Sequence, residues 1–171
     1  MKMKLLIILC SILFFFPISK AQSDSGFVYS RTAPNFMLES IDGEILELND
    51  FIGKGPILLC FWASCCKSAV TQIEDFSGLF DEYHDAGFTM LAIAVDEENT
   101  VAKVKPYAMS KGYKFPVVYD SDGKVARLYY AYDVPFSVLI DKSGKITYSH
   151  LGYMKGDEIE LDKNIKDLLN K

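Results

Sequence analysis

The residues best suited to chemistry are three cysteines that lie within seven positions of one another, Cys60, Cys65 and Cys66. Cys66 has the most favourable setting for a nucleophile, because it falls in the first turn of a predicted helix. The unpaired backbone N–H groups and the dipole at a helix start favour an anion, and Lys67 adds a positive charge beside it. We therefore predict that Cys66 carries a reactive thiolate.

The elements that position Cys66 are a buried strand and the helix that follows it. Residues 57–63 form a continuous apolar run of strand length, which is typical of a strand covered on both faces at the centre of a sheet. Ser64 is a good N-cap residue, and apolar residues then recur at spacings of three and four until Gly87. Strand ends in folds of this kind are the expected place for chemistry.

The rest of the chain alternates strands and helices and ends in a hairpin. A small hairpin is predicted around Asp42-Gly43, a helix over 97–111 that begins at the acidic run 96–98 and is kinked at Pro106, and an amphipathic helix at the end. Further strands are predicted at 88–95, 115–119, 136–140 and 145–150. This order predicts an α/β fold with a central mixed sheet, an antiparallel C-terminal hairpin and helices on both faces.

The first 21 residues have the pattern of a cleaved secretory signal. A basic start at Lys2 and Lys4 precedes an almost unbroken apolar run over 5–18, and small residues precede a cleavage site after Ala21. We divide the chain into a signal peptide at 1–21, a polar lead at 22–32 and a single domain at 33–171. The apolar run is shorter than the roughly 20 residues that a spanning helix needs, so we expect a soluble mature chain without a transmembrane segment.

Charge and export restrict the function further. The mature chain keeps 15 basic and 23 acidic side chains, a net charge of −8, which disfavours nucleic acid as a partner. Export, with the periplasm as the expected compartment, places the cysteines in an oxidising environment. A chain of this size does not need disulfides as structural staples, so the cysteines are available for chemistry.

Several motifs then occur in a characteristic order along the chain. They are Ala33-Pro34-Asn35-Phe36, Asp42-Gly43, Phe61-Trp62-Ala63-Ser64, Phe115-Pro116-Val117, Asp122-Gly123-Lys124, Val134-Pro135 and Leu139-Ile140-Asp141-Lys142-Ser143-Gly144-Lys145. With them the chain, from Ala33 to its end, resembles the exported thioredoxin-like thiol-disulfide oxidoreductases of the TlpA/ResA group, which are related to AhpC/TSA proteins. The resemblance implies a thioredoxin-like fold.

The same resemblance implies the residues of the site. It implies that Pro135 is cis and lies beside Cys66, that Val134 and Pro135 hold an extended peptide, and that Trp62 borders the site. The family motif is Trp-Cys-x-x-Cys, and here Cys65 stands in place of the tryptophan and Ala69 in place of the second, resolving cysteine. A resolving thiol acts because helix positions three apart face each other, and Ala69 offers only a methyl group.

The two other cysteines leave alternatives open for the resolving step. A bond between the adjacent Cys65 and Cys66 would be strained, because adjacent alpha carbons are about 3.8 Å apart and disulfides prefer roughly 4.4 to 6.8 Å. Cys60 stands where thioredoxins place a buried acid. It is most simply a buried core residue, and a disulfide with Cys66 is the alternative.

The leading functional prediction is thiol-disulfide exchange through the single nucleophile Cys66, resolved by Cys65, Cys60 or an external thiol. The expected partners are protein or peptide disulfides and thiols, with a membrane thiol reductant as a further candidate. A redox-inactive peptide-binding module and a thiol peroxidase are the alternatives. No cofactor or metal is expected, because His84 and His150 have no second ligand nearby in the sequence.

Overall fold

The computed structural model describes residues 31–171 of the chain. The predicted signal peptide at 1–21 and its cleavage after Ala21 lie outside the described residues. The lead at 22–32 is described only for its last two residues, Arg31–Thr32, which form strand β1. Within the described part of the chain, no helix combines the length and the apolar character needed to cross a membrane.

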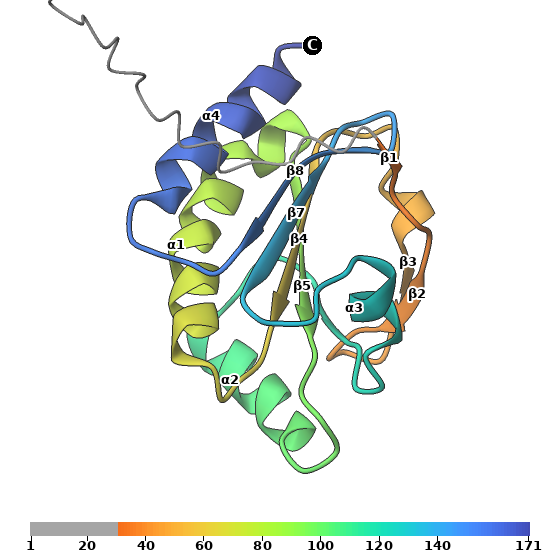
Figure 1. Ribbon diagram of the computed structural model, residues 1–171, viewed down its shortest axis with the longest axis vertical. Helices are drawn as coiled ribbons and strands as arrows, with labels where there is room; N and C mark the ends of the chain where they lie inside the picture. Colours follow the sequence, from red (N-terminus) through yellow and green to blue (C-terminus); the bar gives the residue numbers. More distant parts are fainter. Residues whose placement is uncertain (1–30) are drawn as a thin grey trace, which may run out of the picture.

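The centre of the molecule is a six-stranded mixed sheet in the order β1-β8-β7-β4-β5-β6 (Figure 1). Besides β1 its strands are β4 (Ile57–Trp62), β5 (Thr89–Ala94), β6 (Val117–Tyr119), β7 (Phe136–Ile140) and β8 (Lys145–Leu151). Strands β4, β5 and β6 are parallel, whereas β7 and β8 are antiparallel to their neighbours. The predicted mixed sheet, the interior position of β4 and the C-terminal hairpin are therefore confirmed.

A second, two-stranded sheet lies beside the main one. Its strands are β2 (Met37–Glu39) and β3 (Ile45–Glu47), which pair antiparallel across the turn at Asp42-Gly43. Gly43 has a φ of 87°, in the left-handed region that favours glycine in such turns. The predicted small hairpin is confirmed.

The helices divide between the two faces of the main sheet (Figure 1). They are α1 (Lys67–Tyr83), α2 (Val104–Lys111), α3 (Lys124–Leu128) and α4 (Asp157–Leu169), with short 3-10 turns at Leu48–Asp50, His84–Ala86 and Val101–Lys103. One apolar core contains residues of α1, α2 and α4, and the other contains residues of α3. Alternate residues of β4 enter the two cores, because successive side chains of a strand point to opposite faces.

The region between β5 and α2 differs from the prediction. The acidic run 96–98 does not begin a helix: a 3-10 turn begins only at Val101, and α2 only at Val104. The predicted kink at Pro106 was also wrong, because Pro106 lies in the first turn of α2, where a backbone N–H has no partner within the helix. The first acid of that run, Asp96, is instead buried.

Helix α3 is not predicted by the sequence patterns. It has only five residues, too few for a recognisable apolar periodicity. The carboxylate of Asp120 stabilises its start by accepting hydrogen bonds from the N–H groups of Val125 (3.1 Å) and Ala126 (2.7 Å). The loop that follows α3 leads directly to Val134 and Pro135.

Candidate functional site

Cys66 is the residue with which the chain enters α1. It is the N-cap of the helix, with extended backbone angles (φ −94°, ψ 106°), and α1 itself begins at Lys67. The predicted N-cap, Ser64, was therefore wrong by two positions. Cys66 was predicted within the first helical turn and instead lies directly before it. The strand-to-helix junction is nevertheless where the sequence predicted it, four residues after β4 ends at Trp62.

The physical reason for the displaced helix start is a hydrogen-bonded contact between Ser64 and Asp96. The Ser64 N–H donates to Oδ2 of Asp96 at 2.8 Å, and the Ser64 hydroxyl donates to Oδ1 at 2.5 Å. Both carboxylate oxygens are thus used to fix the turn that carries Cys65 and Cys66. Asp96 is only 2% exposed and follows the buried strand β5. Its place at the end of an apolar run is the feature of the sequence that could have identified it as a structural acid.

The thiol of Cys66 lies against the turn that contains Pro135. Its S–H donates to the carbonyl oxygen of Val134 at 3.6 Å, and its Sγ is 3.4 Å from the hydroxyl oxygen of Ser68. The peptide bond between Val134 and Pro135 is cis. Cys66 is partly exposed, and the turn that it contacts is held to the loop after β8 by a hydrogen bond from the Gly152 N–H to the carbonyl of Pro135 (2.8 Å).

The two other cysteines are in opposite environments. All three cysteines of the described residues are free thiols; Cys65 is exposed and Cys60 is fully buried within β4. Cys60 is opposite Ala92 of β5 and Ser137 of β7 in the strand register. Burial raises the pKa of the Cys60 thiol far above its ordinary value, although Ser137 acts in the opposite direction. Cys60 is accordingly a protonated core thiol.

The position three residues after Cys66 contains no sulfur. Ala69 is fully buried and belongs to the same apolar core as Cys60 and Trp62. Its methyl group fills the space beneath the start of α1, where a second thiol would be close to that of Cys66. No thiol of α1 other than the N-cap thiol is therefore available to the site.

Trp62, which was expected to border the site, is completely buried. Its ring packs against Tyr107 of α2, with ring centres 5.8 Å apart, and its indole N–H has no hydrogen-bond partner. Any influence of Trp62 on a ligand is thus exerted through packing. The exposed aromatic residues of the loop before Pro135 are Tyr130 and Tyr132.

The two histidines lie beside different aspartates. His84 pairs with Asp85 at 3.2 Å, and His150 pairs with Asp157 at 3.3 Å. Within residues 31–171, no group of three or more histidine, cysteine, aspartate or glutamate side chains is arranged to hold a metal ion.

Comparison with known proteins identifies the family. The model of the AhpC/TSA family matches residues 30–149. The chain belongs to the AhpC/TSA family. Among the relatives of this family member is the thiol-disulfide oxidoreductase ResA of Bacillus thuringiensis, which is 33% identical over 130 residues, or 76% of this chain and 73% of the relative.

Solved structures place this AhpC/TSA protein among thioredoxin-like folds. A candidate thiol:disulfide interchange protein DsbE from Chlorobium tepidum has a TM-score of 0.75 and 27% identity, with coverage of 82% of this chain and 96% of the other. The exposed lipoprotein thioredoxin of Streptococcus pneumoniae has a TM-score of 0.65 and 29% identity, with coverage of 79% and 100%. These matches confirm the predicted fold and the resemblance to ResA-like thiol-disulfide oxidoreductases.

Proposed function

We propose that this AhpC/TSA protein is an exported thiol-disulfide oxidoreductase that works through one nucleophilic cysteine, Cys66. The observation that carries the proposal is the contact between the Cys66 thiol and the carbonyl of Val134, next to Pro135. Cys66 is partly exposed at the N-cap of α1, so its sulfur is accessible to a substrate, and the adjacent turn offers backbone groups to an extended substrate. The names of its relatives support a substrate that contains a protein disulfide or thiol.

The first step is attack of the Cys66 thiolate on one sulfur of a substrate disulfide. A disulfide forms between Cys66 and the substrate, the original S–S bond breaks, and the second substrate sulfur leaves as a thiolate that takes a proton from water. An external thiol then attacks the substrate sulfur of the mixed disulfide as its thiolate. The external sulfur becomes joined to the substrate, and the thiolate of Cys66 is released unchanged.

An external resolving thiol fits this site better than an internal one. Cys60 is buried within β4, and its raised pKa keeps it protonated. Position 69 offers a methyl group, and a bond from Cys65 to its immediate neighbour would be strained. A small thiol or the dithiol of a membrane reductant is the kind of molecule that could complete the exchange.

Export is the second part of the proposal. It is supported by the basic start, apolar run and small residues of positions 1–21. The similarity to a structure described as an exposed lipoprotein thioredoxin points in the same direction. Cell fractionation of the producing bacterium, with mass measurement of the mature N-terminus, tests both export and cleavage after Ala21.

The exchange activity is tested by trapping the mixed disulfide. The chain from Gln22 onward is incubated with glutathione disulfide, quenched with acid and analysed by intact mass and peptide mapping. The wild type and a Cys60→Ala, Cys65→Ala double variant should form one glutathione adduct on Cys66, and Cys66→Ala should form none at a comparable rate. The same adduct on Cys66→Ala would refute the assigned nucleophile.

A parallel reaction with hydrogen peroxide separates this proposal from a peroxidase. Oxidation of Cys66 by peroxide no faster than that of free cysteine, together with rapid exchange with disulfides, supports the oxidoreductase. Binding of peptides without any adduct would instead favour a redox-inactive binding module.

A further inference from the structure

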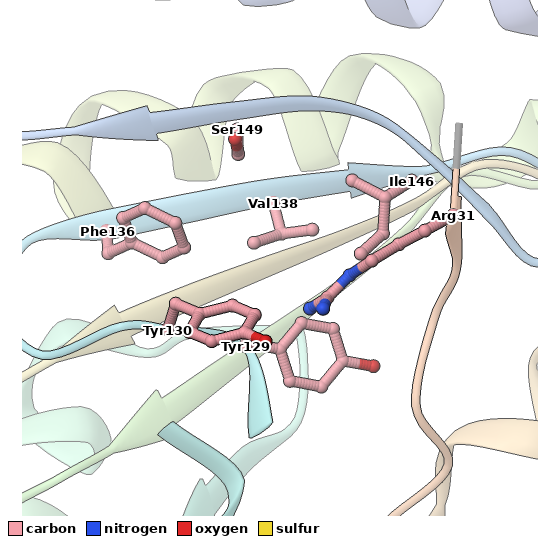
Figure 2. Close-up of a pocket in the computed structure, with 7 residues that line it drawn as sticks. All are labelled: Arg31, Tyr129, Tyr130, Phe136, Val138, Ile146 and Ser149. Carbon is pink, nitrogen blue, oxygen red and sulfur yellow. The ribbon is translucent and has the colours of Figure 1, made fainter. Parts of the chain in front are cut away.

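A cavity of about 490 Å³ lies on the sheet face opposite α1 and α4 (Figure 2). Figure 2 shows side chains from β1, β7, β8 and the loop after α3 directed toward it. We call it the β7–β8 groove; it is lined by Arg31, Tyr129, Tyr130, Phe136, Val138, Ile146 and Ser149. Most of this lining is aromatic or aliphatic, with one cation, so the groove suits an apolar ligand that also carries a negative charge.

One end of the groove lies next in the chain to the turn that faces Cys66. Phe136, at one end of the groove, directly follows Pro135 in the chain. At the other end, Ile146 is opposite both Ile140 of β7 and Arg31 of β1. At about 3.3 Å per residue, the four residues from Phe136 to Ile140 span roughly 13 Å. An extended peptide that starts at the Pro135 turn therefore reaches Arg31 after four or five residues.

Tyr130 places an exposed aromatic ring beside this groove, and its backbone conformation is strained. It is 60% exposed, and its ring lies edge-on to that of Tyr132, with centres 6.2 Å apart. Its φ of 59° is in the left-handed region, and it is the one non-glycine residue of the described chain with a positive φ. A side chain that is both strained and exposed beside a candidate site is better explained by ligand binding than by core packing.

Arg31 supplies a cation that the described residues do not neutralise. Its guanidinium donates to the carbonyl of Leu128 at 3.1 Å and lies 4.8 Å from the centre of the Tyr130 ring. Within residues 31–171 it takes part in no ion pair, although the whole chain has 23 acids and only 18 basic residues. Arginine binds carboxylates through paired N–H groups, so its remaining donors are available to an acid of a ligand.

We propose that the β7–β8 groove binds an extended segment of the substrate polypeptide next to the disulfide that Cys66 attacks. Aromatic or large aliphatic side chains of that segment lie against Tyr130 and Phe136. An acidic residue, four or five positions from the reacting cysteine, pairs with Arg31. The placement of the disulfide depends on the proposed function, whereas the groove itself binds peptide whether or not exchange takes place.

Peptide binding is measured on the mature chain from Gln22 onward by fluorescence anisotropy. The probe is fluorescein-labelled Ser-Gly-Phe-Val-Phe-Glu, in which serine replaces the reacting cysteine. The reversed sequence is measured as well, and each of the two peptides has a version with lysine in place of glutamate. Of the two glutamate peptides, the one that binds the wild type more tightly should bind Arg31→Glu at least tenfold more weakly. This variant should also bind the lysine version more tightly than the glutamate version. Lys163→Glu, the same charge change on exposed α4, should alter neither affinity.

A second variant separates binding from folding. Glycine accepts a positive φ, so Tyr130→Gly should keep or raise the melting temperature while it weakens peptide binding about tenfold. Equal affinity of the wild type, Arg31→Glu and Tyr130→Gly would overturn the proposal, as would the absence of binding by the wild type. If only a Phe27→Ser, Tyr29→Ser variant binds, the chain's own N-terminal segment occupies the groove and the proposal is also wrong.

Reaction rates distinguish a failure of the groove from a failure of the proposed function. The probe is remade with cysteine joined to glutathione, and its reaction with Cys66 is compared with that of glutathione disulfide. Arg31→Glu and Tyr130→Gly should keep the wild-type rate with glutathione disulfide and lose the rate advantage of the peptide. Peptide binding without reaction of Cys66 would overturn the exchange function alone, and reaction without any peptide advantage would overturn the groove alone.

Discussion

The carbonyl oxygen of Val134 accepts a hydrogen bond from the thiol of Cys66 at 3.6 Å, although the two residues are 68 positions apart in the chain. The contact follows from the sheet: β4 and β7 are antiparallel neighbours, with Phe61 opposite Phe136. The residues that follow β4 and those that precede β7 must therefore meet at one end of the sheet. A substrate that reaches the sulfur of Cys66 also meets the Pro135 turn.

Ala69→Cys should convert the single-thiol site into a dithiol site. Helix positions three apart face each other, so the oxidised variant should contain a disulfide between positions 66 and 69. Its glutathione adduct should be released internally, whereas the wild-type adduct should persist until an external thiol is added. Mass spectrometry and thiol counts check both results. Thr71→Cys, an exposed thiol farther along α1, is the control and should leave the adduct stable.

The same substitution has a packing cost. Ala69 is fully buried, so the added sulfur should lower the free energy of unfolding by about 1–3 kcal/mol. Urea unfolding of the reduced proteins measures this cost. Persistence of the adduct in a folded Ala69→Cys variant would show that position 69 does not face Cys66.

Cys60 should be unreactive in the folded protein. With iodoacetamide at mildly alkaline pH, Cys65 and Cys66 should be modified quickly, and Cys60 only as fast as the protein unfolds, because it is buried and its pKa is raised. Peptide mapping after timed quenching provides the measurement. Labelling of native Cys60 at the rate of Cys65 would contradict the described burial.

The raised pKa of Cys60 also sets the direction of a pH effect. Its folded pKa lies above the value of 9.0 for an ordinary thiol, so the folded state disfavours the thiolate. This contribution to stability is complete below about pH 9 and declines as the pH rises above it. Urea unfolding of Cys60→Ala, compared with the wild type on both sides of that pH, should show a difference that shrinks at the higher pH.

Ser64→Ala should destabilise the turn before Cys66. It removes the 2.5 Å hydrogen bond to Oδ1 of Asp96 and leaves a buried carboxylate with one fewer donor. The expected loss in free energy of unfolding is about 1–3 kcal/mol. Ser77→Ala, which removes a local hydrogen bond within α1, is the control and should change stability by less than about 0.5 kcal/mol. Equal losses in the free energy of unfolding would show that the hydrogen bond to Asp96 stabilises the protein no more than the local bond of Ser77.

Tyr83 should titrate well above an ordinary tyrosine. Burial, and then the 2.5 Å hydrogen bond to Asp162, raise the pKa of Tyr83 from 10.0 to about 12. Since the folded pKa exceeds the unfolded one, the resulting stabilisation is complete below pH 10 and is lost as the pH rises toward 12. Phenolate absorbance of the wild type minus that of Tyr83→Phe isolates this titration. Asp162→Asn should move the midpoint of the Tyr83 titration to lower pH. An unchanged midpoint would show that Asp162 does not raise the pKa of Tyr83.

Much of the fold could be predicted because its signals are local. The apolar run over 57–63 identified β4, and the spacing of apolar residues identified α1, since burial on a strand or helix leaves its period in the sequence. Errors arose where a distant partner decided the outcome. Ser64 has the chemistry of an N-cap, but its hydroxyl bonds to Asp96, 32 positions later. A pattern of neighbouring residues does not show whether Ser64 will cap the helix or bond to Asp96.

The sequence by itself determined the chemical inventory of the site: a cysteine at a strand-to-helix junction, a second thiol directly before it and none three positions after it. Only the tertiary structure decided which of these groups can meet. Strand pairing brought Val134 to Cys66, and the sheet interior enclosed Cys60. It also joined Arg31 to Tyr130, nearly a hundred residues later, in one groove. Contacts of this kind depend on how strands align across the sheet, which a pattern of neighbouring residues does not specify.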